Sequence, residues 1–220
     1  MAGGRVGVGS MFLRLAASAG SRGTRGIGLF GYNLYMENHR SQVLPRGAVA
    51  VDCSHARHAP AILTIFNDAI LHSTALYDYE PRTLETMQAW FQAKTAGGFP
   101  VLGLENAAGE LMGFASYGAF RAYPANKYTV EHSVYVDGRF RGLGLGEALM
   151  RLLIDRAHQA QLHVLVGGID ATNAGSIRLH EKLGFVHAGT IRHAGFKFGR
   201  WLDLAFYQLL LDTPVAPIDG

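Results

Sequence analysis

The architecture follows from one stretch of the chain, Tyr128-Thr-Val-Glu-His-Ser-Val-Tyr-Val-Asp137, and the residues directly after it, Gly138-Arg-Phe-Arg-Gly-Leu-Gly-Leu-Gly-Glu-Ala-Leu149. The first part alternates with the period of a strand: one face holds Val130, His132, Val134 and Val136, the other Glu131, Ser133 and Tyr135. The second part interleaves three glycines with leucines and continues with apolar residues at helical spacing. A strand, a glycine turn and a helix start place free backbone N–H groups around one concavity, which favours an anion and most naturally a phosphate.

The glycine turn matches neither of two common nucleotide-binding motifs. A Rossmann fingerprint would need its third glycine where Glu147 or Leu149 stands, and a Walker A loop would need a lysine after the glycines. What remains is Arg141-x-x-Gly144-x-Gly146, in which the arginine adds a cation. On these six residues alone, a loop that uses glycine only to turn tightly is an equal alternative.

Composition indicates an ordinary globular protein, because 49% of the 220 residues are hydrophobic and 17% are charged. The formal net charge is +3, but residues 1–46 hold six arginines and one acid, so they carry +5 and leave −2 for the rest. The mildly acidic remainder argues against a nucleic-acid-binding protein. The single cysteine, Cys53, excludes an intramolecular disulfide and fits a reducing compartment, so we expect a cytoplasmic protein. No uncharged apolar run approaches the roughly 18 residues of a membrane span.

The chain divides into a basic extension (1–46), a folded domain (47–213) and a short tail (214–220). The extension is rich in glycine and arginine and has no lasting periodicity, so we expect it to be mostly disordered. Two explanations stay open: an organelle transit peptide, or translation from an upstream start with Met36 as the functional initiator. We favour the second, because the glycines spoil an amphipathic helix.

The remaining patterns predict an α/β fold with a mixed, mostly antiparallel sheet and helices on both faces. Strands are expected at 48–52, 100–105, 111–117, 128–137, 163–170, 185–198 and 202–211. Helices are expected from about 54 to 70, after Thr83 as N-cap, from the glycine turn to about 159, and over 174–183 with Asn173 as N-cap and Gly184 after its end.

Four separated blocks, in this order, carry a resemblance to a known family: Thr129–Val136, Arg141–Gly146, Asn173 with Ser176–Phe185, and Gly195–Leu204. From about Val49 to Asp212 the chain resembles the GCN5-related N-acetyltransferases, and within them the phosphinothricin and methionine sulfoximine acetyltransferase branch. The resemblance implies an acyl-CoA N-acyltransferase fold, acetyl-CoA as cosubstrate, a small amino acid as acceptor, a homodimer and no metal.

The resemblance also implies roles for individual residues. Glu131 matches the general base, needed because an amine attacks a thioester only when neutral, and His180 is the candidate proton donor or second base. Backbone N–H groups of Val134, Tyr135 and Val136 would serve the developing oxyanion and the pantetheine arm, on a strand that splays there. The cofactor would be held by Arg141, Gly142, Leu143, Gly144, Leu145, Gly146, Glu147, Asn173 and Lys182, although Lys182 could equally be solvated.

The acceptor site is expected at the first helix–loop–helix, with Phe66, Tyr77 and Tyr79, and at the loop before the central strand. In that loop Arg121 and Lys127 could meet the anionic groups of an amino acid, or could be ordinary surface cations. The full set of expected acceptor residues is Tyr77, Arg121, Ala125, Asn126, Lys127, Glu131, His132 and Ser133. Two rival functions remain open: acetylation of a peptide or protein N-terminus, and a catalytically silent acyl-CoA-binding regulatory domain.

Overall fold

The computed structural model of the protein describes residues 44–219. The predicted extension 1–46, with both of its explanations, therefore lies outside the described residues except for its last three positions. Eleven strands and α-helices follow one another in the predicted order: β1 (Val49–Asp52), α2 (His55–His72), α3 (Leu84–Ala96), β2 (Val101–Glu105), β3 (Leu111–Ala119), β4 (Thr129–Val136), α4 (Leu145–Gln159), β5 (Val164–Asp170), α5 (Ala174–Lys182), β6 (Val186–Lys197) and β7 (Arg200–Leu210).

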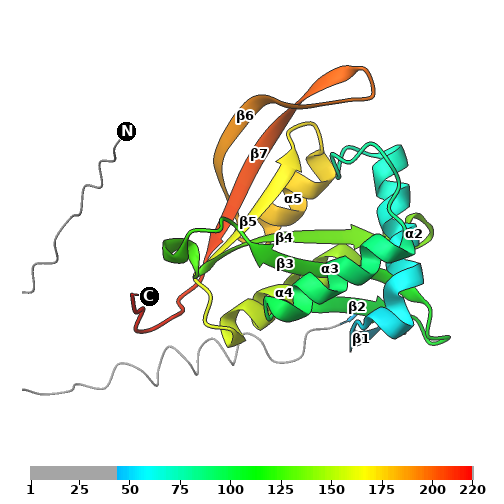
Figure 1. The fold of residues 1–220 in the computed structure, drawn as a ribbon, viewed down its shortest axis with the longest axis horizontal. Helices are drawn as coiled ribbons and strands as arrows, with labels where there is room; N and C mark the ends of the chain where they lie inside the picture. Colours follow the sequence, from blue (N-terminus) through cyan, green and yellow to red (C-terminus); the bar gives the residue numbers. More distant parts are fainter. Residues whose placement is uncertain (1–43, 220) are drawn as a thin grey trace, which may run out of the picture. The chain divides into compact units, whose positions relative to one another are not determined.

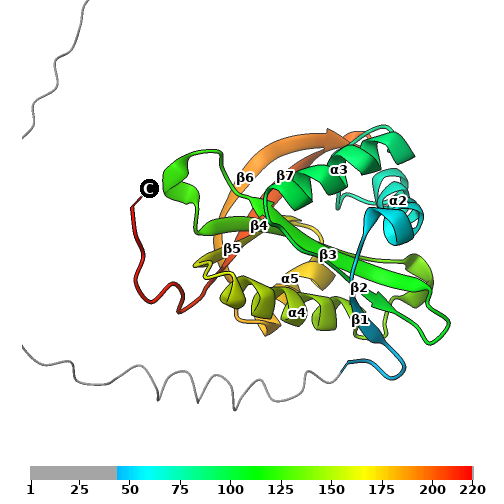
Figure 2. The ribbon, with the colours of Figure 1, turned by 60° about the horizontal axis from the view of Figure 1, so that its bottom comes forward.

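The strands form one seven-stranded sheet in the order β1-β2-β3-β4-β5-β7-β6 (Figure 1). Among the described strands only β4 and β5 pair in parallel, and every other neighbouring pair is antiparallel. Helices α2 and α3 cover one face of the sheet, and α4 and α5 cover the other (Figure 2). The predicted mixed, mostly antiparallel sheet with helices on both faces is confirmed.

Each face of the sheet buries its own apolar cluster. The α4 face is centred on fully buried leucines such as Leu149 and Leu165, and the α2–α3 face on Ile62, Phe66 and Phe114. Burying one such side chain contributes roughly 1.5–3 kcal/mol. β4 contributes to both layers, because Val130 belongs to the cluster on the α4 face and Tyr135 packs against the cluster on the α2–α3 face.

The predicted helix ends are found in the structure. At the start of α3 the Thr83 hydroxyl accepts a hydrogen bond from the Thr86 backbone N–H, and the Thr86 hydroxyl accepts one from the Thr83 backbone N–H. This reciprocal pair is a capping box. Asn173 accepts from the Ser176 N–H at the start of α5, and Gly184 follows the last turn with a φ of +88°. The left-handed conformation at Gly184 favours glycine and reverses the chain into β6.

The parallel pairing of β4 and β5 stops halfway along the strands. It runs from Thr129–Val164 to His132–Gly167, whereas β4 stays paired with β3 as far as Val136. Within the described part of the chain, no residue of β5 pairs with positions 133–136 of β4. The two strands therefore diverge, and the backbone groups of this half of β4 that face β5 have no strand partner.

Candidate active site

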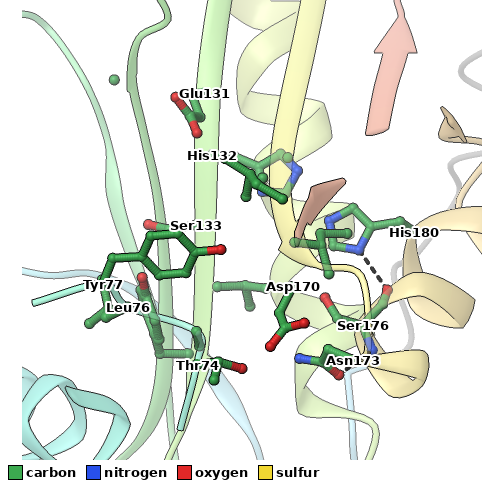
Figure 3. Close-up of a pocket in the computed structure, with 18 of the residues that line it drawn as sticks. Thr74, Leu76, Tyr77, Glu131, His132, Ser133, Asp170, Asn173, Ser176 and His180 are labelled. Atoms are coloured by element: carbon green, nitrogen blue, oxygen red, sulfur yellow. Dashed lines mark hydrogen bonds between the residues drawn. The ribbon is translucent and has the colours of Figure 1, made fainter. Parts of the chain in front are cut away.

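A cavity of about 450 Å³ opens where β4 and β5 diverge. Its wall comes from the end of β3, from β4 and β5, from α5, from one residue each of α3 and β7, and from the loop after α2. The side chains that give it chemical character are Thr74, Tyr77, Lys94, Glu131, His132, Ser133, Asp170, Asn173, Ser176 and His180 (most labelled in Figure 3).

Glu131 is half-buried and projects from the α2–α3 face of β4. On the neighbouring strand, Gly168 leaves room for it, because a Cβ at that position would lie 3.2 Å from the Glu131 Oε1. Burial raises the pKa of the Glu131 carboxyl, and the positive charge of Arg121 opposes this increase. A carboxylate with a raised pKa in a cavity wall has the properties of a general base.

His132, the next residue, points to the opposite side of β4, where its ring stacks on that of His180 (Figure 3). The ring centroids are 5.1 Å apart and the planes differ by 16°. Burial lowers the pKa of His132 to about 3, with a further contribution from His180. Burial also lowers the pKa of His180. Both imidazoles are therefore neutral at pH 7.

The proton on His180 is located by its hydrogen bond. Its Nδ1 lies 2.7 Å from the Ser176 carbonyl oxygen, which can only accept, so Nδ1 carries the hydrogen and Nε2 carries the lone pair. The Nε2 of His180 and both ring nitrogens of His132 are buried without a protein hydrogen-bond partner among the described residues. Such groups are costly unless water or a ligand satisfies them, which indicates a binding site.

Gly167 makes this histidine pair possible. A Cβ at this position of β5 would lie 2.9 Å from the His132 Nε2 and 3.0 Å from the His180 Nε2. Distances this short would displace both rings. The glycine is therefore required by the close approach of two side chains.

The loop after α2 forms the wall opposite the histidines, and the β6–β7 hairpin holds this loop in place. The buried Nζ of Lys197 donates to the carbonyl oxygens of Ile70 (2.6 Å), Ser73 (3.0 Å) and Leu76 (2.6 Å). The Tyr77 ring lies against Gly195, where a Cβ would be 2.7 Å from it. The position of Tyr77 in the cavity wall therefore depends on the far end of the sheet.

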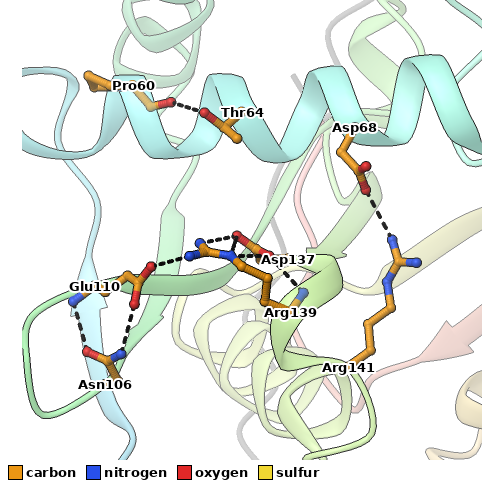
Figure 4. A network of polar contacts seen from close by, with 8 residues as sticks. All are labelled: Pro60, Thr64, Asp68, Asn106, Glu110, Asp137, Arg139 and Arg141. Atoms are coloured by element: carbon orange, nitrogen blue, oxygen red, sulfur yellow. Dashed lines mark hydrogen bonds and ion pairs between the residues drawn. The ribbon is translucent and has the colours of Figure 1, made fainter.

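The predicted cofactor turn follows β4 directly. Asp137 accepts from the Arg139 backbone N–H, and the Arg139 side chain binds both Asp137 and Glu110 (Figure 4). Gly142 and Gly144 have φ of +80° and +77°, and a Cβ at either would meet no atom within 4 Å. Gly144 precedes α4, and no side chain caps the N-terminal N–H groups of this helix.

These features fit the diphosphate of a coenzyme A thioester. The turn is open, its backbone conformation favours glycine, and the helix start offers unpaired N–H groups. Arg141 supplies a cation beside it. Its one ion pair within residues 44–219 is with Asp68, at 3.4 Å and with both groups exposed, which is a weak pair (Figure 4). Glu147 is neutralised by ion pairs with Arg151 and Lys182.

The structure brings together some of the predicted site residues and separates others. Those lining the cavity are Tyr77, Glu131, His132, Ser133, Val134, Tyr135, Asn173 and His180. Four predicted acceptor residues do not line it: Arg121, Ala125, Asn126 and Lys127. Arg121 and Lys127 lie over the rings of their neighbours Phe120 and Tyr128. Of the other two aromatic residues expected at the acceptor site, Phe66 is buried in the core, and Tyr79 is exposed and donates to the Phe196 carbonyl.

Lys94 lines the cavity and is absent from the sequence prediction. A signal was present, because Lys94 continues the i, i+4, i+7 stripe of Met87 and Phe91, which are buried in α3. A lysine on a buried stripe has to reach an acceptor, here the Tyr117 carbonyl at 2.7 Å. Gly167 and Asp170 were likewise not predicted, since their place depends on where β5 leaves β4.

Cys53, the single cysteine, is not suited to nucleophilic catalysis. Burial raises the pKa of the Cys53 thiol to about 12, with contributions from Glu105 and Asp52, so it is a poor nucleophile. Residues 44–219 contain no cluster of three or more His, Cys, Asp or Glu side chains suited to a metal ion. In the same range, none of the helices has the length and hydropathy needed to cross a membrane.

Comparison with known proteins gives one consistent result. The model of the Acetyltransferase (GNAT) family matches residues 64–185. An L-methionine sulfoximine/L-methionine sulfone acetyltransferase of Pseudomonas paraeruginosa is 50% identical over 159 residues, which cover 72% of this chain and 92% of the relative. A phosphinothricin N-acetyltransferase of Streptomyces coelicolor is 35% identical over 146 residues, which cover 66% of this chain and 85% of the relative. A Salmonella typhimurium acetyltransferase, solved with its cofactor acetyl-CoA, is 42% identical, superimposes with a TM-score of 0.74, and is matched over 78% of this chain and 98% of its own.

Proposed function

The chain belongs to the acetyltransferase (GNAT) family, and from this premise we propose that it transfers the acetyl group of acetyl-CoA to the α-amino group of a small amino acid. Methionine sulfoximine and methionine sulfone are the first acceptors to test, because they are named for the relative at 50% identity, and phosphinothricin is the next. The single observation that carries the proposal is the cavity between β4 and β5, which both Glu131 and His180 line.

Acetyl-CoA, when bound, supplies an activated acetyl thioester. The Arg141–Glu147 turn and the start of α4 would hold its diphosphate, and the unpaired half of β4 would donate N–H groups toward the carbonyl oxygen of the thioester. The geometry supports a cofactor that enters from the α4 side and an acceptor that enters from the α2–α3 side.

Glu131 would take the proton from the acceptor amine, directly or through one water. Its raised pKa makes it a stronger base than an exposed glutamate and favours this transfer. The lone pair on the His180 Nε2 supports the role of a second base rather than that of a proton donor, since the proton is on Nδ1 and burial disfavours the doubly protonated ring.

A direct assay tests the proposal: release of coenzyme A measured against a panel of free amino acids and short peptides. We expect turnover with methionine sulfone and methionine sulfoximine, and a loss of at least about 100-fold in Glu131→Gln, the low end of general-base contributions. Undiminished turnover in Glu131→Gln would remove the base. Preferential acetylation of peptides would favour the N-terminal acetyltransferase function, and no turnover with any acceptor would favour the silent acyl-CoA-binding domain.

Three further expectations belong to the same proposal. The homodimer and the cytoplasmic location are carried over from the family resemblance and the single cysteine, and residues 47–213 are expected to form the catalytic unit. Light scattering on the purified chain measures the oligomeric state, and acetyl transfer by a chain that starts at Met36 tests whether residues 1–35 are dispensable.

A further inference from the structure

Lys94 provides the positive charge in the cavity wall. Among the residues that line the cavity, all of them within the described range, it is the one lysine, and no arginine is present. It comes from the last turns of α3, and its Nζ donates 2.7 Å to the Tyr117 carbonyl oxygen. The rings of Trp90 and Phe99 lie 5.4 and 5.9 Å from the Nζ and limit the positions it can take.

The register of the sheet relates Lys94 to the proposed base through Gly118. Glu131 of β4 is directly opposite Gly118 of β3, and side chains at such positions project from the same face about 5 Å apart. Gly118 has no side chain, and a Cβ there would lie 3.4 Å from the Lys94 Nζ. The ammonium group therefore lies beside the strand position that pairs with Glu131, in space that a longer side chain at Gly118 would fill.

Lys94 and Glu131 line the same cavity but are not paired with each other. Within residues 44–219, no ion pair joins Lys94 to any carboxylate, and its one protein acceptor is the neutral Tyr117 carbonyl. An ammonium group has three N–H donors, so two remain available toward the cavity. A charge with unused donors in a partly buried wall is suited to binding an anion.

We infer that Lys94 binds the α-carboxylate of the acceptor while Glu131 receives its amino group, so that this pair selects α-amino acids. The inference rests on the proposed function and names the residue that determines its substrate class. An α-amino acid carries its amine and its carboxylate on one carbon, which suits a cavity lined by both a carboxylate, Glu131 of β4, and a cation, Lys94 of α3. A carboxylate placed in this cavity without a cation would lose hydration without compensation. The charge of Arg121 also acts on Glu131, but Arg121 is exposed, lies on Phe120 and does not line the cavity, so Lys94 is the better placed of the two cations.

The test compares methionine sulfone with its primary carboxamide, which has the same amine and side chain but no carboxylate. We expect the wild-type protein to prefer the free acid, and Lys94→Met to lower kcat/KM for the acid by roughly 10- to 100-fold, the loss expected for one charge-assisted hydrogen bond, with little change for the carboxamide. Lys94→Arg keeps a cation and should keep the preference. The matched control, Arg121→Met, should change kcat/KM for acid and carboxamide by the same factor.

A second measurement uses pH. Burial lowers the pKa of Lys94 to about 8, so its charge is lost as the pH rises through this value. The KM for the free acid should therefore increase above pH 8 in the wild type, and the KM for the carboxamide should not follow it. The inference is overturned if Lys94→Met lowers kcat/KM for acid and carboxamide equally, or leaves the value for the acid unchanged. If the wild type acetylates neither compound, the proposed function itself fails, and the inference falls with it.

Discussion

Replacing Lys197 by methionine should loosen the cavity wall that lies opposite the two histidines. The substitution keeps most of the aliphatic chain but removes three hydrogen bonds, to the carbonyl oxygens of Ile70, Ser73 and Leu76. Each buried carbonyl left without a donor costs about 1–3 kcal/mol. Removing the buried ammonium group relieves its own desolvation and offsets part of this loss. We therefore expect the free energy of unfolding to fall by about 2–4 kcal/mol.

Urea unfolding, with the midpoint and the slope fitted for each variant, measures this change. The control is Lys182→Met, because that lysine is exposed and its ion pair with Glu147 should contribute about 0–1 kcal/mol. The loop held by Lys197 carries Tyr77, so the KM for the acceptor should increase while the KM for acetyl-CoA stays close to the wild-type value. The reasoning is refuted if Lys197→Met loses no more stability than Lys182→Met.

Three further predictions concern the cavity and its surroundings. Gly167→Ala should displace the rings of His132 and His180, lowering kcat at a cost of about 1–3 kcal/mol in stability, and wild-type turnover in this variant would contradict the packing argument. Because burial raises the pKa of Glu131 above its usual 4.5, kcat/KM corrected for the ionisation of the amine should decline as the pH falls through that raised value, and a pH–rate profile without this acid limb would exclude the base. Cys53, whose pKa is raised to about 12, should react with iodoacetamide at pH 8 much more slowly in the folded than in the urea-unfolded protein, and equal rates measured by mass spectrometry would show that the thiol is not protected.

Much of the fold could be predicted from the sequence because its signals are local. Alternation across Thr129–Val136 and helical spacing after Gly146 identify β4 and α4, and Thr83 and Gly184 mark helix ends through their backbone chemistry. The family resemblance is confirmed by the matching family model and by the relatives. These features depend on neighbours a few residues apart, which a sequence displays directly.

The arrangement of the site depends on contacts between distant segments, and the sequence shows these less well. Alternation indicates that Glu131 and His132 face opposite ways, but only the packing of α5 shows that His132 lies on His180 and away from the proposed acceptor side. The expected cations, Arg121 and Lys127, are close to Glu131 in the chain but do not line the cavity. Their side chains lie instead over the aromatic rings of Phe120 and Tyr128. The roles assigned to individual residues stay predictions until they are measured.

The measurement that tests the central claim most directly is a crystal structure of the protein with coenzyme A and methionine sulfone. The account predicts the diphosphate on the N–H groups of the Gly142–Gly146 turn and the sulfur in the opening between β4 and β5. It also predicts that the acceptor amine is hydrogen-bonded to the Glu131 carboxylate, directly or through one water. A complex in which the turn is empty, or in which Glu131 points away from the amine, would contradict it.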